Sequence, residues 1–154
     1  MTKSSVDNVL RMFLARYDVK WVPPIVSKEV GSYFGNAEAN AVFSKHGLCF
    51  KEDRELCSFL SKGVMTSLSE DILQKVENFA HSSQEMDAIL NNQTYSQAFK
   101  EIEHKIERGN LILEAPIVIL FNDGSLWLYS GRKRIYAAKK NGVPIQYFLV
   151  TQQK

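Results

Sequence analysis

A glycine followed by three cations stands near the end of the 154-residue chain, as Gly131-Arg132-Lys133-Arg134. Arginine forks match the geometry of phosphate oxygens, and lysine adds a point charge. The segment joins a strand-like run, LWLYS, to a helix-like run, IYAAKK. Because the first N–H groups of a helix have no partners within it and favour anions, these residues predict a phosphate site at a helix N-terminus.

The same cluster also fits a simpler interpretation, a solvated basic surface. The net charge of +2 is too small to imply a nucleic-acid or membrane partner. The charge is nevertheless uneven, because no acidic residue follows Gly124, whereas six cations do. Three cations in a first turn oppose the helix dipole by about a few tenths of a kcal/mol each. An anion bound among them would remove that conflict.

The elements around the cluster predict an α+β fold. APIVILF is a nearly continuous β-branched run, typical of a strand buried on both faces, and Asn122-Asp123-Gly124 predicts a tight turn. We expect strands at 115–121, 125–130 and 144–150, and a helix at 132–140 that ends at Asn141-Gly142. An amphipathic helix from Thr94 to Gly109 should precede them.

Residues 1–90 are expected to form a mostly helical extension, and residues 91–154 the core that carries the cations. Apolar faces at 6–17 and 72–79 predict two helices, the second capped by Ser67 with Glu70. VKWVPPIV predicts a short extended segment that is an edge strand or ends early, because its prolines lack N–H donors. Residues 31–55 show no sustained period and predict loop with short elements.

The remaining reactive side chains predict no catalytic set, and the catalytic residues stay unknown. His46, His81 and His104 lack ligand spacing and are interpreted as surface or capping residues, and the two cysteines fit no zinc pattern, so no metal site is expected. Asp123 is assigned to the turn. Trp127 and Tyr129 could stack on a base, but core or partner packing is the favoured interpretation.

The stretch ERGNLILEAPIVILFNDGSLWLYSGRKRIYAAKKNGVPIQYFLV resembles the core of the ParB/sulfiredoxin superfamily over about residues 95–150. The shared pattern is a helix, a PIVV-type strand, a turn, a strand ending in Gly-x-x-Arg, a helix with two alanines, and a closing strand. Here the signature is Gly131 to Arg134, the alanines are Ala137 and Ala138, and the closing glycine is Gly142. The resemblance implies a ParB/sulfiredoxin-like core of helix, β-hairpin, helix and strand.

In that superfamily the Gly-x-x-Arg loop holds nucleotide phosphates, of ATP in sulfiredoxins and of CTP in ParB proteins. The resemblance therefore implies ATP or CTP, with Mg²⁺, bound at Gly131 and Arg134, with Arg132 and Lys133 assisting. The sequence departs from the family pattern at two points, which limits what the resemblance implies. Arg132 replaces the catalytic cysteine of sulfiredoxin, and only residues 151–154 follow where ParB has a DNA-reading domain. Sulfinic-acid reduction and centromere binding are not expected.

Two hypotheses remain open. The first is a nucleotide-binding enzyme that hydrolyses or transfers a phosphate, or acts as a nuclease, with Asp123 and Glu114 as guesses for its acidic residue. The second is a non-catalytic regulator that binds nucleic acid or a partner protein. The N-terminus lacks a signal-peptide pattern, and no apolar stretch approaches the ~20 residues of a membrane span, so a cytoplasmic protein without a membrane partner is expected.

Overall fold

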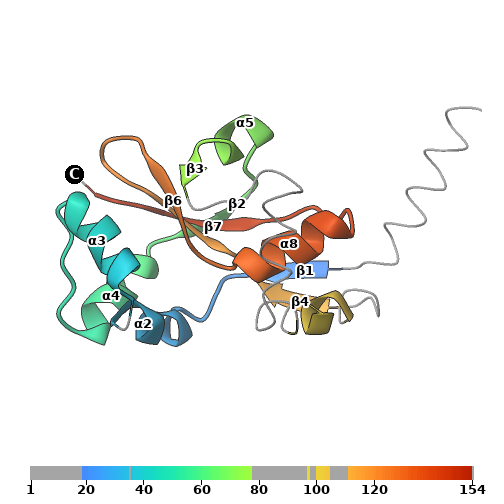
Figure 1. Ribbon diagram of the computed structural model, residues 1–154, viewed down its shortest axis with the longest axis horizontal. Helices are drawn as coiled ribbons and strands as arrows, with labels where there is room; N and C mark the ends of the chain where they lie inside the picture. Colours follow the sequence, from blue (N-terminus) through green and yellow to red (C-terminus); the bar gives the residue numbers. More distant parts are fainter. Residues whose placement is uncertain (1–18, 35, 78–96, 98–99, 105–110, 154) are drawn as a thin grey trace, which may run out of the picture. The chain divides into compact units, whose positions relative to one another are not determined.

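The computed structural model describes residues 19–34, 36–77, 97, 100–104 and 111–153, and Figure 1 shows their course. The chain is of mixed α+β class, as expected. It divides into two compact units, and each combines residues from both sides of the expected boundary near residue 90. Unit 1 consists of Met1–Val22, Ala80–Leu113 and Arg132–Ile145, and unit 2 consists of Pro23–Phe79, Glu114–Gly131 and Gln146–Lys154.

Unit 2 is built on a five-stranded sheet in the order β2-β7-β5-β6-β3. Its strands are β2 (Val64–Thr66), β3 (Val76–Glu77), β5 (Ile117–Leu120), β6 (Leu126–Ser130) and β7 (Tyr147–Thr151). β5 pairs antiparallel with β6 and parallel with β7, so Ile119 stands between Trp127 and Val150. β2 runs antiparallel to β7, and β3 runs parallel to β6.

The hairpin of β5 and β6 confirms the predicted strand-turn-strand pattern. Ile117, Val118 and Ile119 are fully buried, as their β-branched run requires of a strand paired on both edges. The turn closes with hydrogen bonds from the Phe121 N–H to the Ser125 carbonyl at 2.9 Å and from the Gly124 N–H back to the Phe121 carbonyl at 3.0 Å. Gly124 has φ 87°, so this is the three-residue hairpin loop that needs a glycine in the left-handed region.

Three helices of unit 2 pack on one face of its sheet, and Figure 1 shows them grouped together. They are α2 (Val26–Phe34), α3 (Ala37–Lys45) and α4 (Asp53–Leu60). The expectation of loop with short elements over 31–55 was therefore wrong. One local signal for α3 is Asn36, whose side chain accepts a hydrogen bond from the Ala39 N–H at 3.1 Å and caps the helix.

The helix expected over residues 67–79 is also wrong in length. α5 spans only Glu70–Leu73, and its cap is Ser69, whose hydroxyl accepts from the Ile72 N–H at 3.3 Å, in place of Ser67. Val76 then enters β3 opposite Leu126 and is buried there. Pairing with β6 provides hydrogen-bond partners for the backbone of β3, which a longer helix would have provided internally. The tertiary contact therefore overrides the helical period of the sequence.

Unit 1 contains β1 (Val19–Val22), all but the last residue of β4 (Leu111–Glu114), and α8 (Arg132–Lys140). β1 and β4 form a two-stranded sheet. β1 ends before Pro23, as predicted for a strand followed by prolines. The indole N–H of Trp21 donates to the Pro144 carbonyl at 2.9 Å. Residues 97 and 100–104 are helical, in agreement with the helix expected from Thr94 to Gly109, while the helix expected at 6–17 lies outside the described residues.

Candidate functional site

The predicted phosphate-binding segment lies at the first turn of α8. β6 ends at Ser130, Gly131 follows with φ 103°, and α8 begins at Arg132. The helix therefore starts at the residue predicted from the sequence. A φ of this size lies in the left-handed region, which branched side chains rarely adopt, so the change of direction needs a glycine at this position.

The three cations fill that first turn, which holds no acidic residue. Arg132, Lys133 and Arg134 are each partly buried, and each takes part in an interaction within the chain. Their side chains are therefore neither fully exposed nor without contacts. Any anion bound here would have to share or replace the contacts these side chains already make.

The rest of α8 anchors its first turn. Ile135, Tyr136, Ala137 and Ala138 are all buried. At the other end, the Val143 N–H donates to the Ala138 carbonyl at 2.8 Å and the Gly142 N–H donates to the Lys139 carbonyl at 3.2 Å. With Gly142 at φ 68°, this is a Schellman end, and it confirms the predicted stop at Asn141-Gly142. A buried, capped helix holds its N-terminal N–H groups in fixed directions.

Ser130 is a feature of this region that sequence reasoning missed. Its hydroxyl oxygen is buried and has no hydrogen-bond partner in the described part of the chain. A buried hydroxyl without a partner costs free energy, so such groups are uncommon in folded proteins. No pattern in the sequence distinguishes Ser130 from an ordinary strand-end serine.

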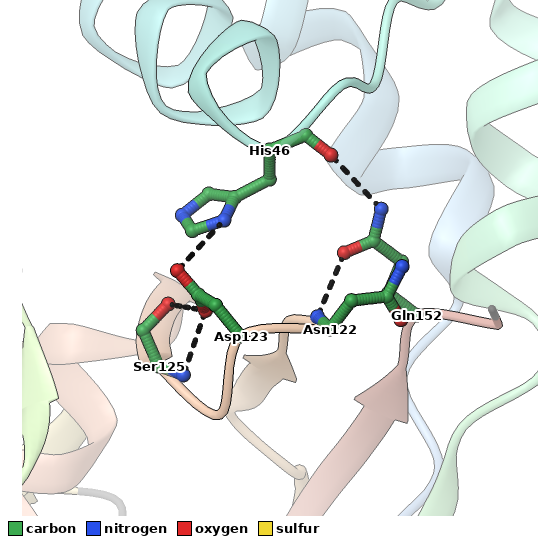
Figure 2. A network of polar contacts seen from close by, with 5 residues as sticks. All are labelled: His46, Asn122, Asp123, Ser125 and Gln152. Carbon is green, nitrogen blue, oxygen red and sulfur yellow. Dashed lines mark hydrogen bonds and ion pairs between the residues drawn. The ribbon is translucent and has the colours of Figure 1, made fainter.

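A second polar cluster lies in unit 2 and is shown in Figure 2. Asp123 accepts hydrogen bonds on Oδ1 from the Ser125 N–H at 2.9 Å and from the Ser125 hydroxyl at 2.6 Å. Its Oδ2 lies 3.5 Å from Nδ1 of His46. The two Ser125 bonds, and the charge of His46 when that ring is protonated, hold the pKa of Asp123 below its ordinary value.

Ser125, Asp123 and His46 are linked here, but the order of their contacts does not activate the serine hydroxyl as a nucleophile. In a catalytic triad the histidine lies between serine and aspartate and accepts the hydroxyl proton. Here Asp123 lies in the middle, and the Ser125 hydroxyl donates to its carboxylate. The cluster therefore fixes the hairpin turn, which confirms the interpretation of Asp123 as a turn residue.

Gln152 ties the same turn to the end of α3. Its side-chain N–H₂ donates to the His46 carbonyl at 3.0 Å, and its Oε1 accepts from the Asn122 N–H at 2.9 Å. Figure 2 shows the amide bridging the two backbones. His46 occupies the C-cap position of α3, in agreement with the capping interpretation. The alternative of a surface histidine is wrong, because its side chain is only 8% exposed.

The aromatic side chains of β6 belong to the core. Trp127 is buried, and Tyr129 is partly buried and donates its hydroxyl proton to the Glu29 carbonyl at 2.7 Å. Both rings pack beside Phe43 of α3. Core packing is therefore confirmed over base stacking for this pair.

The acidic residues guessed as catalytic have structural contacts. Glu114 accepts from the Ile25 N–H at 2.6 Å and lies 3.9 Å from the Lys28 ammonium, so it supports the start of α2. Among the described residues, no group of three or more histidine, cysteine or acidic side chains could hold a metal ion. His104 is an exposed residue of a helical segment, and His81 lies outside the described residues.

Within the part of the chain that the structure describes, no helix has the length and apolar character that a membrane crossing requires. Comparison with models of known families, with curated proteins and with solved structures finds no match to this chain.

Proposed function

We propose that the chain binds a phosphate group at the N-terminus of α8, with Gly131, Arg132, Lys133 and Arg134 forming the site. The observation that carries the proposal is the conformation of Gly131, at φ 103°, directly before a first turn that holds three cations and no acid. A helix without a ligand favours acidic residues in that turn, because its N–H groups carry partial positive charge.

An oxyanion at this position would receive hydrogen bonds from the first N–H groups of α8 and charge-assisted bonds from the arginines. Gly131 lets the backbone approach the ligand, since it has no Cβ. The burial of Ile135 and Ala138 and the capped end of the helix support the proposal, because they fix the N–H groups before the ligand arrives.

The ligand class that we propose is a nucleotide or the phosphate backbone of nucleic acid. The order of β5, turn, β6, Gly131, α8 and β7 follows the pattern of the ParB/sulfiredoxin resemblance, whose loop takes ATP or CTP with Mg²⁺. A ParB/sulfiredoxin-like core is accordingly part of the proposal.

The geometry supports binding of the phosphate ligand better than its hydrolysis. Asp123 stabilises its turn through Ser125, and Glu114 stabilises the start of α2. Both acidic residues considered for catalysis therefore have a structural role. Phosphate transfer by this protein, or nuclease action, would require a carboxylate beyond these two.

Ligand titrations of the full chain test the proposal. Wild type would be titrated with ATP, CTP and an oligonucleotide, each with Mg²⁺ and at two salt concentrations, by calorimetry. Arg134→Ala should weaken binding by about 1.5–3 kcal/mol, roughly tenfold to a hundredfold, through loss of a charge-assisted contact. Gly131→Val should weaken it comparably, through backbone strain rather than charge.

Lys139→Ala is the matched control, because it removes a cation from the last turn of the same helix. It should leave affinity unchanged. Melting temperatures without ligand show whether a variant has lost its fold, since Arg134 already has an interaction in the chain. A steep loss of affinity with salt and no preference among nucleotides would identify nucleic acid as the ligand. If wild type binds none of these, the proposal is wrong.

A further inference from the structure

We propose that the side-chain amide of Gln152 controls a local opening of unit 2, in which the end of α3 and the β5–β6 turn separate together while the sheet stays closed. The amide joins two backbones that are distant in the sequence, and Figure 2 shows it between them. Its N–H₂ donates to the His46 carbonyl at 3.0 Å, and its Oε1 accepts from the Asn122 N–H at 2.9 Å. Both bonds are therefore lost when this one side chain moves away.

The two backbone groups that Gln152 binds belong to the ends of their elements. His46 is the C-cap residue of α3, and the last carbonyl groups of a helix have no donor within it. Asn122 follows β5 and lies in the turn. One side group that both donates and accepts can satisfy both partners, and a primary amide has this property whereas a carboxylate does not.

The sheet fixes the position from which the amide reaches its partners. The Gln152 N–H donates to the Leu120 carbonyl at 2.8 Å, which continues the pairing of β7 with β5. Ile117, Val118 and Ile119 of β5 are fully buried. Because a buried central strand belongs to the most stable part of a fold, we expect the sheet to remain closed while the segments attached to it open.

Side-chain contacts also join the end of α3 to the turn, but they do not replace the amide. The His46 ring stacks on Phe121 with centroids 3.7 Å apart, and its Nδ1 lies 3.5 Å from the Asp123 carboxylate. Asp123 is 57% exposed, so water screens that attraction. The bond to the His46 carbonyl is partly buried. Without Gln152 that carbonyl needs water as a partner, and water enters only if the turn and the helix end move apart.

Native-state hydrogen exchange of the full chain measures this opening. The reporters are two amides that do not bind Gln152, one on each segment. The Leu48 N–H donates to the Phe43 carbonyl at 2.9 Å, and the Gly124 N–H donates to the Phe121 carbonyl at 3.0 Å. Gln152→Ala should lower the protection of both by about five- to fiftyfold relative to the amides of β5, the equivalent of two ordinary hydrogen bonds.

Two further variants show whether the bridge is the cause. Gln152→Glu keeps the size and the acceptor for Asn122 but loses the donor for the His46 carbonyl, so at pH 7 it should resemble Gln152→Ala. Gln153→Ala makes the same change at the exposed neighbouring residue and should behave as wild type.

Four results would overturn the inference. They are unchanged protection in Gln152→Ala, a loss at only one of the two reporters, wild-type protection in Gln152→Glu, and an equal loss at the β5 amides, which would mean that Gln152 acts on the whole fold.

Discussion

The ring of Phe43 lies edge-on to the indole of Trp127, with centroids 5.7 Å apart and planes at 83°. Phe43 comes from α3 and Trp127 from β6, so this pair joins the helical layer of unit 2 to its sheet. Four more aromatic rings surround Phe43 at 5.2 to 6.1 Å, those of Phe50, Phe59, Phe121 and Tyr129. The edge-on geometry suits the charge distribution of aromatic rings.

Phe43→Ala should destabilise the protein more than other single changes in unit 2. The side chain is fully buried, and its removal leaves a cavity that five neighbouring rings cannot easily fill. The expected loss in the free energy of unfolding is about 3–5 kcal/mol, measured by urea denaturation. Phe59→Ala is the comparison, because Phe59 is only partly buried and should cost less. Equal losses would contradict the central position of Phe43.

Gly63→Ala tests a steric constraint beside β2. A Cβ at this position would overlap the ring of Phe148, which is buried in the same core as Phe43. The ring cannot leave without opening that core, so we expect a loss of about 1–3 kcal/mol in the free energy of unfolding.

Gly47→Ala separates that steric cost from backbone strain. Gly47 has φ 75°, and a Cβ there would meet no atom within 4 Å. Its loss should be about 1 kcal/mol, caused by conformation alone. If a second change, Phe148→Leu, recovers stability in Gly63→Ala but not in Gly47→Ala, the two costs have the different origins assigned to them.

The parts of the fold that were predictable are those encoded over short distances. The run at 117–120, the Asn122 to Gly124 turn and Gly131 each carry their signal in a few adjacent residues, and all three lie where the sequence placed them. The long helix over 67–79 was not realised, because Val76 pairs with Leu126, a partner 50 residues away. Periodicity holds no information about such a partner.

The polar sites show the same difference between features encoded by adjacent residues and features that depend on distant ones. The position of the cations at the start of α8 could be predicted from a glycine and a change of period. The bridge made by Gln152 could not, since a glutamine near a chain end is ordinarily solvated and its two partners lie at residues 46 and 122. His46 was recognisable as a cap, but its stacking on Phe121 depends on how α3 packs beside the hairpin.

The lowered pKa of Asp123 predicts how stability changes in acid. A carboxyl group with a depressed pKa in the folded state contributes stability above its ordinary pKa of about 3.9, and this is lost as pH falls through the folded pKa. Asp123→Asn should therefore be less stable than wild type at pH 7, and the difference should shrink below pH 4. Urea denaturation at pH 3, 5 and 7 measures it.

Ser125→Ala is the informative companion in that series, because the Ser125 hydroxyl is the largest cause of the shift. It should lose part of the acid dependence while retaining the carboxylate. A difference between wild type and Asp123→Asn that stays constant from pH 7 to pH 3 would show that the carboxylate charge contributes no stability.

Ser130→Ala should leave the protein as stable as wild type or raise its free energy of unfolding by up to about 1 kcal/mol. The hydroxyl is buried without a hydrogen-bond partner in the described structure, so its removal ends a desolvation cost and breaks no bond. Ser125→Ala is the same chemical change where the hydroxyl donates to a carboxylate at 2.6 Å, and it should lower stability. Urea denaturation at pH 7 compares the two, and a clear loss in Ser130→Ala would mean that its hydroxyl is paired in solution.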